Sequence, residues 1–287
     1  MVESDLNIFA LKTMELGQSA SRLEVIKISN GEYLIKKYGS STRLRTQFNK
    51  HMEALEKGIL PIKVPKIVGE FDAKSNSYIM EYIRGNPLGI FISNTSSVDI
   101  NLASEIICSY IYSSFDNSAT DSNLNSQFEI KLDLITNKIK ETHEINNIFY
   151  ELAMFCQASN QKYAYPSGWN HGDLSFENII VVDNSLDLYG IDFLDSPFES
   201  PLLDFGRLWL DSKYGWWGSG YKETSNSFIN RSILSKNLQN VANKLEIQSE
   251  IINLFTAFAI LRIRPYTKKA LRLAYLKSAA KKILEGE

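Results

Sequence analysis

The sequence predicts an α+β fold with an N-terminal antiparallel sheet that carries one helix and a larger, mainly helical C-terminal lobe. Polar and apolar residues alternate through residues 22–38 on both sides of a turn, which is typical of a β-hairpin. From about Gly89 onward, apolar residues recur mainly at helical spacing, apart from a short β-rich hairpin at 178–191. With 287 residues and 44% hydrophobic residues, the chain can bury the core of one large domain or two small ones.

The first strands are the clearest elements. Residues 22–28 and 32–38 flank the pair Asn30-Gly31, which supplies the positive φ angles of a tight hairpin turn. Residues 10–16 add a third strand, which ends in the small-residue turn Gly17-Gln18-Ser19-Ala20-Ser21. Such a turn can bring backbone amides close to an anion, so Ser19 is a candidate phosphate contact. One glycine followed by serines more often forms an ordinary turn, and that alternative stays open.

One helix follows the hairpin. The residues Ser40-Ser41-Thr42 offer a helix cap, and Gly58 ends the helix. Apolar residues recur between them at helical spacing and define the stripe that we expect to face inward: Leu44, Phe48, Met52 and Leu55.

A second hairpin of the same sheet is predicted at residues 66–71 and 78–83, which a polar turn connects. The segment Arg84-Gly85-Asn86-Pro87 then breaks the pattern, since Gly and Pro mark the places where a chain changes direction. We therefore expect an N-terminal lobe at residues 1–83 and a C-terminal lobe at residues 84–287.

Charge and cysteine content narrow the class of protein. The 31 Lys and Arg residues against 33 Asp and Glu residues give a net charge of −2, which excludes a globally basic nucleic-acid coat. We expect no nucleic-acid partner. The two cysteines, Cys108 and Cys156, are too few for a disulfide scaffold and lack the spacing of a metal knuckle, so we expect small buried thiols in a reducing compartment.

Membrane and secretion signals are not evident. The first residues lack a basic region followed by an apolar stretch. The longest apolar run, Ile251 to Ile263, is interrupted by polar residues and is shorter than the roughly 20 residues that a membrane span needs. We expect a cytoplasmic protein without stable membrane insertion.

The densest polar cluster is His171-Gly172-Asp173-Leu174-Ser175-Phe176-Glu177-Asn178, followed after a hairpin by Ile191-Asp192-Phe193. A hairpin returns the chain to its starting side, so Asn178 and Asp192 should lie at one mouth with Asp173 on the preceding loop. An amide oxygen and two carboxylates that converge there would bind a hard divalent cation such as Mg²⁺, which prefers oxygen ligands. This donor set suits nucleotide phosphate chemistry.

The spacing of this cluster resembles a known family. Asp173 and Asn178 have the spacing of a kinase catalytic loop, and Asp192-Phe193 resembles the later metal-binding motif. The chain resembles the aminoglycoside phosphotransferase and choline kinase family in three successive motifs. They are His171-Gly172-Asp173-Leu174-x-x-x-Asn178-Ile179, then Ile191-Asp192-Phe193-x-Asp195, then Pro201-x-x-Asp204. That family is the small-molecule branch of the protein-kinase-like two-lobed fold. Gly172 in place of Arg, and Leu194 in place of Gly, point away from protein kinases.

The resemblance implies a role for each residue. Asp173 would be the catalytic carboxylate that receives or orients the hydroxyl proton, and Asn178 and Asp192 would be metal ligands. His171 would hold the catalytic loop in place, and Asp204 would hydrogen-bond to that loop from behind. Taken alone, His171 would be an ordinary loop histidine and Asp204 a helix cap. The N-terminal lobe would bind nucleotide, and the C-terminal lobe would hold the catalytic and substrate-binding groups.

A lysine of the second hairpin strand is the candidate phosphate contact. Leu34 and Lys36 share one face of the strand while Ile35 and Lys37 share the other, so only one lysine can point into the cleft. The hydrophobic-hydrophobic-Lys pattern of the family selects Lys36. A solvated strand lysine is the alternative.

The glutamate that pairs with such a lysine has no clear counterpart on the following helix. Glu53 lies opposite the predicted inward stripe, whereas His51 falls within it. Three alternatives stay open: the helix is kinked, His51 or Gln47 takes the pairing position, or the ion pair is absent.

The resemblance also implies the nucleotide. Residues 78–83 resemble the hinge of the family, where backbone groups near Glu81 and Ile83 would hydrogen-bond adenine. A buried edge strand would have the same residues. The cofactors implied are ATP, with GTP as the alternative nucleotide, and Mg²⁺.

The activity implied is transfer of the ATP γ-phosphate to a hydroxyl of a small molecule: a sugar, amino sugar, aminoglycoside or amino alcohol. A narrower resemblance, at Asp192-Phe193-Leu194-Asp195-Ser196 and Asp211-x-Lys213-Tyr214-x-Trp216, indicates surface-polysaccharide metabolism. The alternative is a non-catalytic nucleotide-binding pseudokinase module, which the missing glutamate favours. The oligomeric state stays open.

Two further features concern the acceptor. The four tryptophans, Trp169, Trp209, Trp216 and Trp217, either form a platform for a sugar or a cationic amine or pack in the core. The stretch Arg262 to Lys282 has eight basic residues and no acidic one. We expect it to form the solvated face of terminal helices, with attraction of a phosphorylated or membrane-associated substrate as the alternative.

Overall fold

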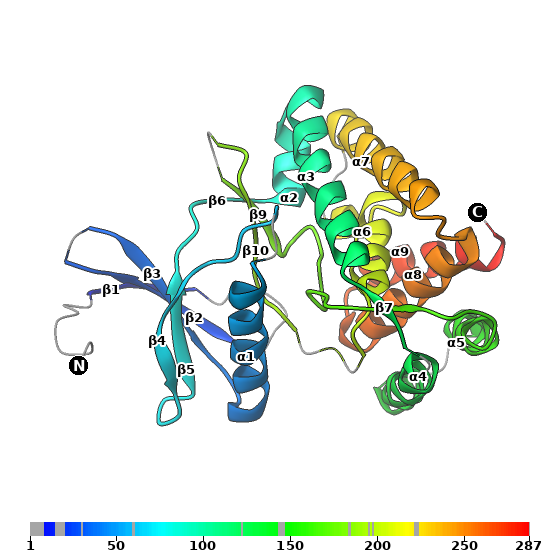
Figure 1. The fold of residues 1–287 in the computed structure, drawn as a ribbon, viewed down its shortest axis with the longest axis horizontal. Helices are drawn as coiled ribbons and strands as arrows, with labels where there is room; N and C mark the ends of the chain where they lie inside the picture. The colour runs from blue at the N-terminus through cyan, green and yellow to red at the C-terminus, as the bar shows by residue number, and fades with distance from the viewer. Residues whose placement is uncertain are drawn as a thin grey trace.

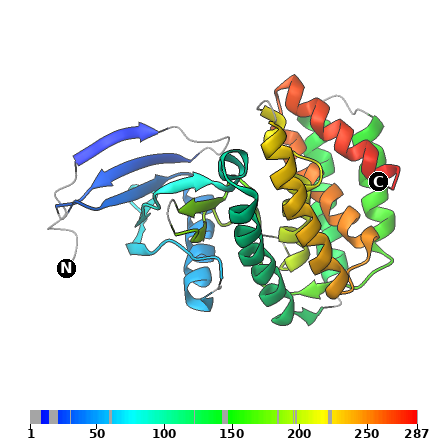
Figure 2. The same cartoon turned by 90° about the horizontal axis from the view of Figure 1, so that it is seen from above.

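The structure is a computed structural model that describes residues 9–14, 21–29, 31–58, 61–121, 123–142, 147–182, 185–194, 196, 198–220 and 224–286. A sheet with one helix forms the first lobe, and a bundle of helices forms the second (Figure 1). The view from above shows the sheet and the bundle side by side (Figure 2).

The first lobe is an antiparallel sheet. Its described strands are hydrogen-bonded in the order β1-β2-β3-β5-β4. Their bounds are β1 (Phe9–Met14), β2 (Arg22–Lys27), β3 (Tyr33–Tyr38), β4 (Ile67–Asp72) and β5 (Ser77–Glu81). Both predicted hairpins and the additional N-terminal strand are therefore confirmed.

Helix α1 (Ser41–Lys57) lies against the sheet, and Gly58 ends it in the left-handed conformation, at φ 56°. The predicted inward stripe is wrong, because the buried side of α1 is rotated about the helix axis relative to that stripe. The fully buried residues are Leu44, Gln47, Lys50, His51 and Ala54. Two neighbours cover the helix: the sheet takes the apolar side, and the second lobe takes the side that bears Lys50 and His51.

The chain leaves the first sheet after Glu81 and joins a second sheet at β6 (Gly85–Pro87). In that sheet the described strands follow the order β10-β9-β6, where β9 is Ile179–Val182 and β10 is Leu188–Gly190. The hairpin predicted at 178–191 is confirmed. The expected lobe boundary between residues 83 and 84 falls in the segment between the two sheets.

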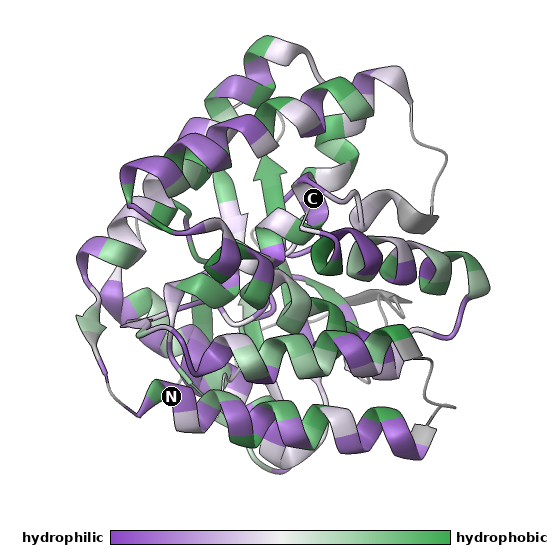
Figure 3. Cartoon of the chain, turned by 90° about the vertical axis from the view of Figure 1, so that its right-hand side faces the viewer, coloured by the Kyte–Doolittle hydropathy of each residue, from purple (hydrophilic) through white to green (hydrophobic). Residues whose placement is uncertain are grey.

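The remainder of the second lobe is helical, with one pair of two-residue strands, β7 (Ala119–Thr120) and β8 (Pro166–Ser167). Hydrophobic and hydrophilic residues alternate along its helices (Figure 3). In the described part, the elements are α2 (Leu88–Asn94), α3 (Ser97–Asp116), α4 (Leu124–Thr142), α5 (Asn147–Asn160), α6 (Pro201–Ser212), η1 (Trp217–Gly220), α7 (Ser225–Lys244), α8 (Ser249–Ile263), η2 (Arg264–Tyr266) and α9 (Ala270–Leu284).

Helix α6 lies at the centre of this lobe, and all its residues are buried. It packs closely against α8, because Gly206 has no side chain at the crossing: a Cβ there would lie 2.6 Å from the backbone carbon of Phe255. Helix α8 contains the longest apolar run of the sequence, and most of that run is buried against other helices. No helix among the described residues is long and apolar enough to cross a membrane.

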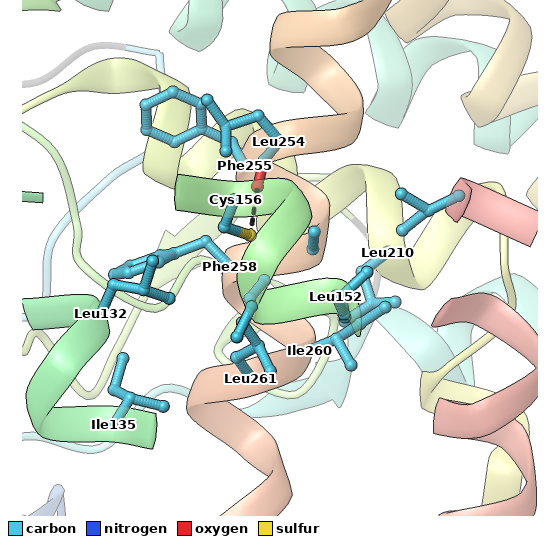
Figure 4. Close-up of a cluster of buried hydrophobic side chains, with 14 of the residues drawn as sticks. Leu132, Ile135, Leu152, Cys156, Leu210, Leu254, Phe255, Phe258, Ile260 and Leu261 are labelled. Atoms are coloured by element: carbon cyan, nitrogen blue, oxygen red, sulfur yellow. Dashed lines mark hydrogen bonds between the residues drawn. The ribbon is translucent and has the colours of Figure 1, made fainter. Parts of the chain in front are cut away.

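The larger core cluster surrounds α8 and includes Cys156, which is fully buried (Figure 4). Its Sγ lies 3.9 Å from the carbonyl oxygen of Leu254, and burial raises the pKa of this thiol far above its ordinary value. Cys108 is partly buried, and burial raises its pKa to about 11. Both cysteines are free thiols, and Cys156 packs as a small apolar residue, as predicted.

Candidate active site

The loop to which the resemblance assigns catalysis, residues 171–178, runs from β8 to β9, and we call it the catalytic loop. The backbone N–H of Ile191 donates to the carbonyl oxygen of Asn178 at 2.9 Å, which extends the β9–β10 ladder by one step. Asn178 and Asp192 are therefore neighbours at the mouth of the hairpin, with Asp173 on the loop before them. Hairpin geometry predicted this arrangement from the sequence.

Asp173 is held at both of its carboxylate oxygens. The Nε of Arg207 donates to Oδ1 at 3.0 Å, and the Nδ2 of Asn178 lies 3.3 Å from Oδ2. About a third of the Asp173 side chain remains exposed, at 32%. Burial raises the pKa of Asp173, but the guanidinium groups of Arg207 and Arg262 outweigh burial and hold this pKa below its ordinary value. The carboxylate is therefore ionised at neutral pH.

Asp204 of α6 supports the loop from behind, as the sequence predicted. Its carboxylate accepts hydrogen bonds from the backbone N–H of His171 at 2.7 Å, the N–H of Gly172 at 3.1 Å, and the Tyr110 hydroxyl at 2.6 Å. Its side chain is buried. Burial outweighs these hydrogen bonds and raises the pKa of Asp204 to about 6.

A second support from α6 was not predicted. Asp211 accepts from the backbone N–H of Phe176 at 2.9 Å and from Nη1 of Arg207 at 3.1 Å. Arg207 thus bridges Asp173 and Asp211, and both ends of the loop are fixed to one helix. The sequence signal was present, because Arg207 and Asp211 stand four residues apart, where oppositely charged helix residues pair.

His171 packs inside the loop. It is 2% exposed, its Nδ1 accepts a long hydrogen bond from the N–H of Asp173 at 3.4 Å, and its ring lies 4.4 Å from the ring of Phe193. Burial lowers its pKa to about 4, so the ring is neutral at pH 7. These contacts fit the loop-holding role that the resemblance implies.

The two departures from the protein-kinase pattern lie against each other. Gly172 has φ +86°, and a Cβ there would overlap the carbonyl oxygen of Leu194. The N–H of Leu194 in turn donates to the carbonyl oxygen of His171 at 3.1 Å. Only glycine fits here, because a side chain would meet both a strained backbone angle and a backbone atom.

Asp192 has a left-handed backbone, with φ 63°, which is uncommon for a residue other than glycine. Its side chain is 30% exposed and forms an ion pair through Oδ1 with the Nζ of Lys37. Non-glycine residues with this backbone occur in turns, where Asp is one of the residues that tolerate it, and they also cluster at functional sites.

The structure corrects the face assigned to the strand lysine. Lys37, which is 3% exposed, meets Asp192, whereas Lys36 lies on the other face with its Nζ 5.3 Å from the ring of Tyr38. The alternation along β3 was predicted correctly, but the wrong face was selected. The face of Ile35 and Lys37 is the one that α1 and the second lobe cover.

Helix α1 supplies no glutamate to Lys37 within the part of the chain that the structure describes. Gln47 is buried with both amide atoms unpaired, and the Nε2 of His51 lies 2.7 Å from the carbonyl oxygen of Pro65. Glu53 pairs with Lys57 at 2.8 Å. Of the three alternatives, the absent helix ion pair is the one observed, and Asp192 takes the place of the glutamate.

Helix α1 is instead tied to the second lobe by a lysine. Lys50 is 5% exposed, and its Nζ lies 2.5 and 2.6 Å from the carboxylate oxygens of Glu199. The same Nζ lies 5.0 Å from the centre of the Trp169 ring. The two lobes therefore meet through a partly buried ion pair near the catalytic loop.

The expected adenine contacts lie at the end of β5 and in the connection that follows it. The N–H of Glu81 donates to the carbonyl oxygen of Lys66 at 2.8 Å, so that donor is already used. Ile83 lies in the connection between β5 and β6, and its backbone makes no hydrogen bond to the described residues. Ser19 lies outside the described residues.

Two side-chain oxygen atoms at the mouth of the hairpin could serve as ligands of a magnesium ion. Asn178 donates through Nδ2, which leaves its Oδ1 as a ligand, and Asp192 uses only one carboxylate oxygen for Lys37. Among the described residues, no group of three or more His, Cys, Asp or Glu side chains forms a metal site. Mg²⁺ needs no such group, because one or two protein oxygens suffice when phosphates complete the shell.

Two of the four tryptophans are buried in the core, and the other two are partly buried. Trp209 and Trp216 are 6% and 8% exposed, so they pack in the core rather than in an open platform. Trp217 is partly buried, and its ring packs on Gly89, where a Cβ would lie 1.9 Å from the ring. Trp169 is also partly buried.

The basic C-terminal stretch is not uniformly solvated, which corrects the expectation. Arg264 is 5% exposed, with its guanidinium 5.3 Å from the centre of the Phe149 ring. Arg262 donates from Nη2 to the carbonyl oxygen of Gly172 at 2.9 Å, on the catalytic loop. Lys281 and Lys282 are exposed on α9, as predicted.

No family model and no curated protein match the chain. Solved structures do match it over nearly the whole length. An ethanolamine kinase of Plasmodium vivax is 13% identical, with a TM-score of 0.58 over 98% of this chain and 84% of that chain.

Two aminoglycoside phosphotransferases match as well. A thermostable mutant of APH(4)-Ia in a ternary complex with AMP-PNP and hygromycin B has a TM-score of 0.66 at 8% identity, over 97% of this chain and 94% of that one. Aminoglycoside 2'-phosphotransferase-IIIa in its GDP complex has a TM-score of 0.58 at 16% identity, over 98% and 94%. The chain therefore has the two-lobed, protein-kinase-like fold of the aminoglycoside phosphotransferases and ethanolamine kinase, as its motifs indicated.

Proposed function

We propose that this protein is a phosphotransferase that moves the γ-phosphate of ATP to a hydroxyl of a small molecule. The observation that carries the proposal is the conjunction at one hairpin mouth of Asp173, Asn178 and Asp192, next to the buried Lys37. Independent turn or capping roles do not require these residues to meet. The fold shared with structures that hold GDP or AMP-PNP supports a nucleotide between the lobes.

Asp173 would act on the acceptor hydroxyl. The acceptor oxygen attacks the γ-phosphorus, the bond from that phosphorus to the β–γ bridging oxygen breaks, ADP leaves, and the hydroxyl proton is released through Asp173. Arg207 makes this carboxylate a weak base by lowering its pKa. Asp173 would therefore mainly orient the hydroxyl and receive its proton late, which suits a reaction that depends on positioning.

The nucleotide would lie on the side of Lys37. Lys37 would turn from Asp192 to the phosphate oxygens, and backbone groups near Glu81 and Ile83 would meet the base, with ATP preferred and GTP as the alternative. Asn178 and Asp192 would hold Mg²⁺, and the bound ion would neutralise part of the phosphate charge. We also place the protein in the cytoplasm, a location supported by its free cysteines, and without a nucleic-acid partner.

A test measures ADP release from the purified protein with MgATP and a panel of sugars, amino sugars, aminoglycosides and amino alcohols. Asp173→Asn should lower turnover at least about 100-fold, because the positioned carboxylate is lost. Asp133→Asn, an exposed aspartate of α4, is the matched control and should leave turnover unchanged. The absence of a phosphorylated product with every one of these acceptors and with their carboxylate and phosphate counterparts would contradict the proposal.

The second candidate is a non-catalytic nucleotide-binding module. It is favoured by the Lys37–Asp192 ion pair, which occupies a phosphate-binding lysine in the absence of a glutamate from α1. Under this candidate, MgATP raises the melting temperature of the protein, while no acceptor elicits ADP release. Melting curves with and without MgATP, measured on the same preparation as the turnover assay, separate the two functions.

A further inference from the structure

Arginines from three different helices approach the catalytic loop. Arg207 of α6 contacts Asp173, Arg262 of α8 contacts the carbonyl oxygen of Gly172, and Arg272 of α9 lies 3.8 Å from Glu177. All three helices belong to the second lobe, away from the sheet and its nucleotide side (Figure 1). Arg207 therefore contacts Asp173 directly, and Arg262 and Arg272 contact the neighbouring loop residues Gly172 and Glu177.

Two of these guanidinium groups have incomplete partners. Arg262 is mostly buried, and no carboxylate in the described part of the chain lies within 4.0 Å of it. The Arg272 side chain is 17% exposed, and its Nε is buried without a hydrogen-bond partner. Arg262 thus has no carboxylate at ion-pair distance among the described residues, and Arg272 has only the exposed Glu177 at 3.8 Å. Partly compensated buried cations of this kind are suited to an anionic ligand, because such a ligand supplies charge-assisted hydrogen bonds.

The carboxylates nearby are already used. Asp211 is 1% exposed and shared between Arg207 and the N–H of Phe176. Asp173 is paired with Arg207. Glu177, with a 57% exposed side chain, is the remaining acid of the loop, and it already faces Arg272. A cationic acceptor would find no carboxylate free of an arginine among these three described groups.

Aromatic faces, the other common means of binding a cation, are also occupied. The guanidinium of Arg272 lies over the ring of Trp216, 5.6 Å from its centre, where a ligand cation would bind. Trp209 is buried and stacked with Phe205. The arrangement thus differs from what an amino alcohol or an aminoglycoside requires.

We infer that the acceptor carries an acidic group, a carboxylate or a phosphate, which binds Arg272 and Arg262 while its hydroxyl meets Asp173. A planar guanidinium matches the oxygens of either anion through paired N–H donors. The inference rests on the proposed phosphotransferase function and narrows its acceptor class from sugars and amines to hydroxy acids and phosphorylated alcohols.

The test uses matched acceptors that differ only in charge: glucose, glucuronic acid, glucose 6-phosphate and 6-amino-6-deoxyglucose, together with glycerol, glycerate, glycerol 3-phosphate and serinol. Calorimetry measures their binding to the protein loaded with MgADP, and ADP release measures turnover with MgATP. In at least one series, an acidic member should bind about tenfold or more tightly than its neutral and amino counterparts. The carboxylate and phosphate members separate the two sources of negative charge.

Variants assign the effect to the arginines. Arg272→Gln should weaken binding of the acidic acceptor about tenfold and leave the KM for ATP unchanged, whereas Arg272→Lys should retain part of the affinity. Lys282→Gln, an exposed cation on the same helix, should change neither value. A rise in the KM for ATP in Arg272→Gln would place this arginine on the nucleotide and overturn the inference.

Failure of the inference is distinct from failure of the function. Turnover with a neutral or amino acceptor preferred over its acidic counterpart would overturn the acidic class while supporting the phosphotransferase. Selective binding of acidic acceptors without ADP release would support the anion site and contradict the phosphotransferase. Equal binding across both series would overturn the inference.

Discussion

The catalytic loop has two sides that are built differently. Behind it, Asp204 and Asp211 are each 1% exposed, and together they accept hydrogen bonds from three backbone N–H groups of the loop. In front of it, Asp192 is 30% exposed, and one of its oxygens has no partner among the described residues. We call these the back and the front of the loop.

The back of the loop is built to stabilise the fold, and the front is built to bind a ligand. Buried, fully partnered carboxylates fix a loop before any ligand arrives, since leaving a buried donor unpaired is costly. Partly exposed oxygens on a strained backbone retain capacity for a ligand. Substitutions at the back should therefore reduce stability, and substitutions at the front should reduce binding with little loss of stability.

The largest effect is expected from Asp204→Ala. It removes the acceptor for His171 N–H, Gly172 N–H and the Tyr110 hydroxyl at once, and each unpaired buried donor costs about 1–3 kcal/mol. The free energy of unfolding, measured by urea titration, should fall by about 3–5 kcal/mol.

Tyr110→Phe is the matched control for this variant, because it removes one donor and leaves the carboxylate with its two backbone partners. A loss of about 1 kcal/mol is expected. An equal loss in both variants would show that the backbone hydrogen bonds do not support the loop.

Gly172→Ala should have the next largest effect, because a side chain there meets both the positive φ angle and the Leu194 carbonyl oxygen. We expect a loss of about 2–3 kcal/mol in the free energy of unfolding, together with loss of turnover. Gly218→Ala is the control, since nothing lies within 4 Å of a Cβ at that position. A stable, active Gly172→Ala protein would contradict the close contact between the loop and Leu194.

The pH dependence of stability sharpens the contrast further. The pKa of Asp204 is raised from 3.8 to about 6, so the folded state holds this proton more tightly and its contribution to stability falls as pH rises from about 4 to 6. The pKa values of His51 and His171 are lowered from 6.5 to about 4, so their contributions rise with pH over the same range.

Asp204→Asn removes only the first contribution. The stability gap between the variant and the natural protein should therefore narrow as pH rises from 4.5 to 6.5, by on the order of 2 kcal/mol. Urea titrations at three pH values measure it. A gap that stays constant would mean that Asp204 has an ordinary pKa in the folded protein.

Local geometry explains what the sequence predicted well. Asn178 and Asp192 meet because a hairpin returns the chain to its origin, and both strands are short apolar β-rich segments separated by a turn. The loop support from Asp204 was also predicted, although through the motif resemblance rather than from local pattern. In these places a few neighbouring residues determine the geometry.

Contacts between distant segments explain the errors. Alternation along β3 could not tell which lysine faces inward, since that depends on the helix and the second lobe that cover the face. The inward stripe of α1 was rotated for the same reason: Lys50 meets Glu199, 149 residues away in the chain. The contact of Asp211 with Phe176 likewise joins segments 35 residues apart.

The smallest change in stability and a large change in binding are expected at the front, from Lys37→Met. Lys37 is buried and its partner Asp192 is partly exposed, so an apolar side chain of similar length should alter the free energy of unfolding by no more than about 1 kcal/mol. The dissociation constant for MgATP, measured by calorimetry, should rise about tenfold or more, because the cation for the phosphates is lost. Lys36→Met on the same strand is the control, and its affinity should stay unchanged. If Lys36→Met loses affinity and Lys37→Met does not, the inward face of β3 changes when nucleotide binds, and the front of the loop is not preformed.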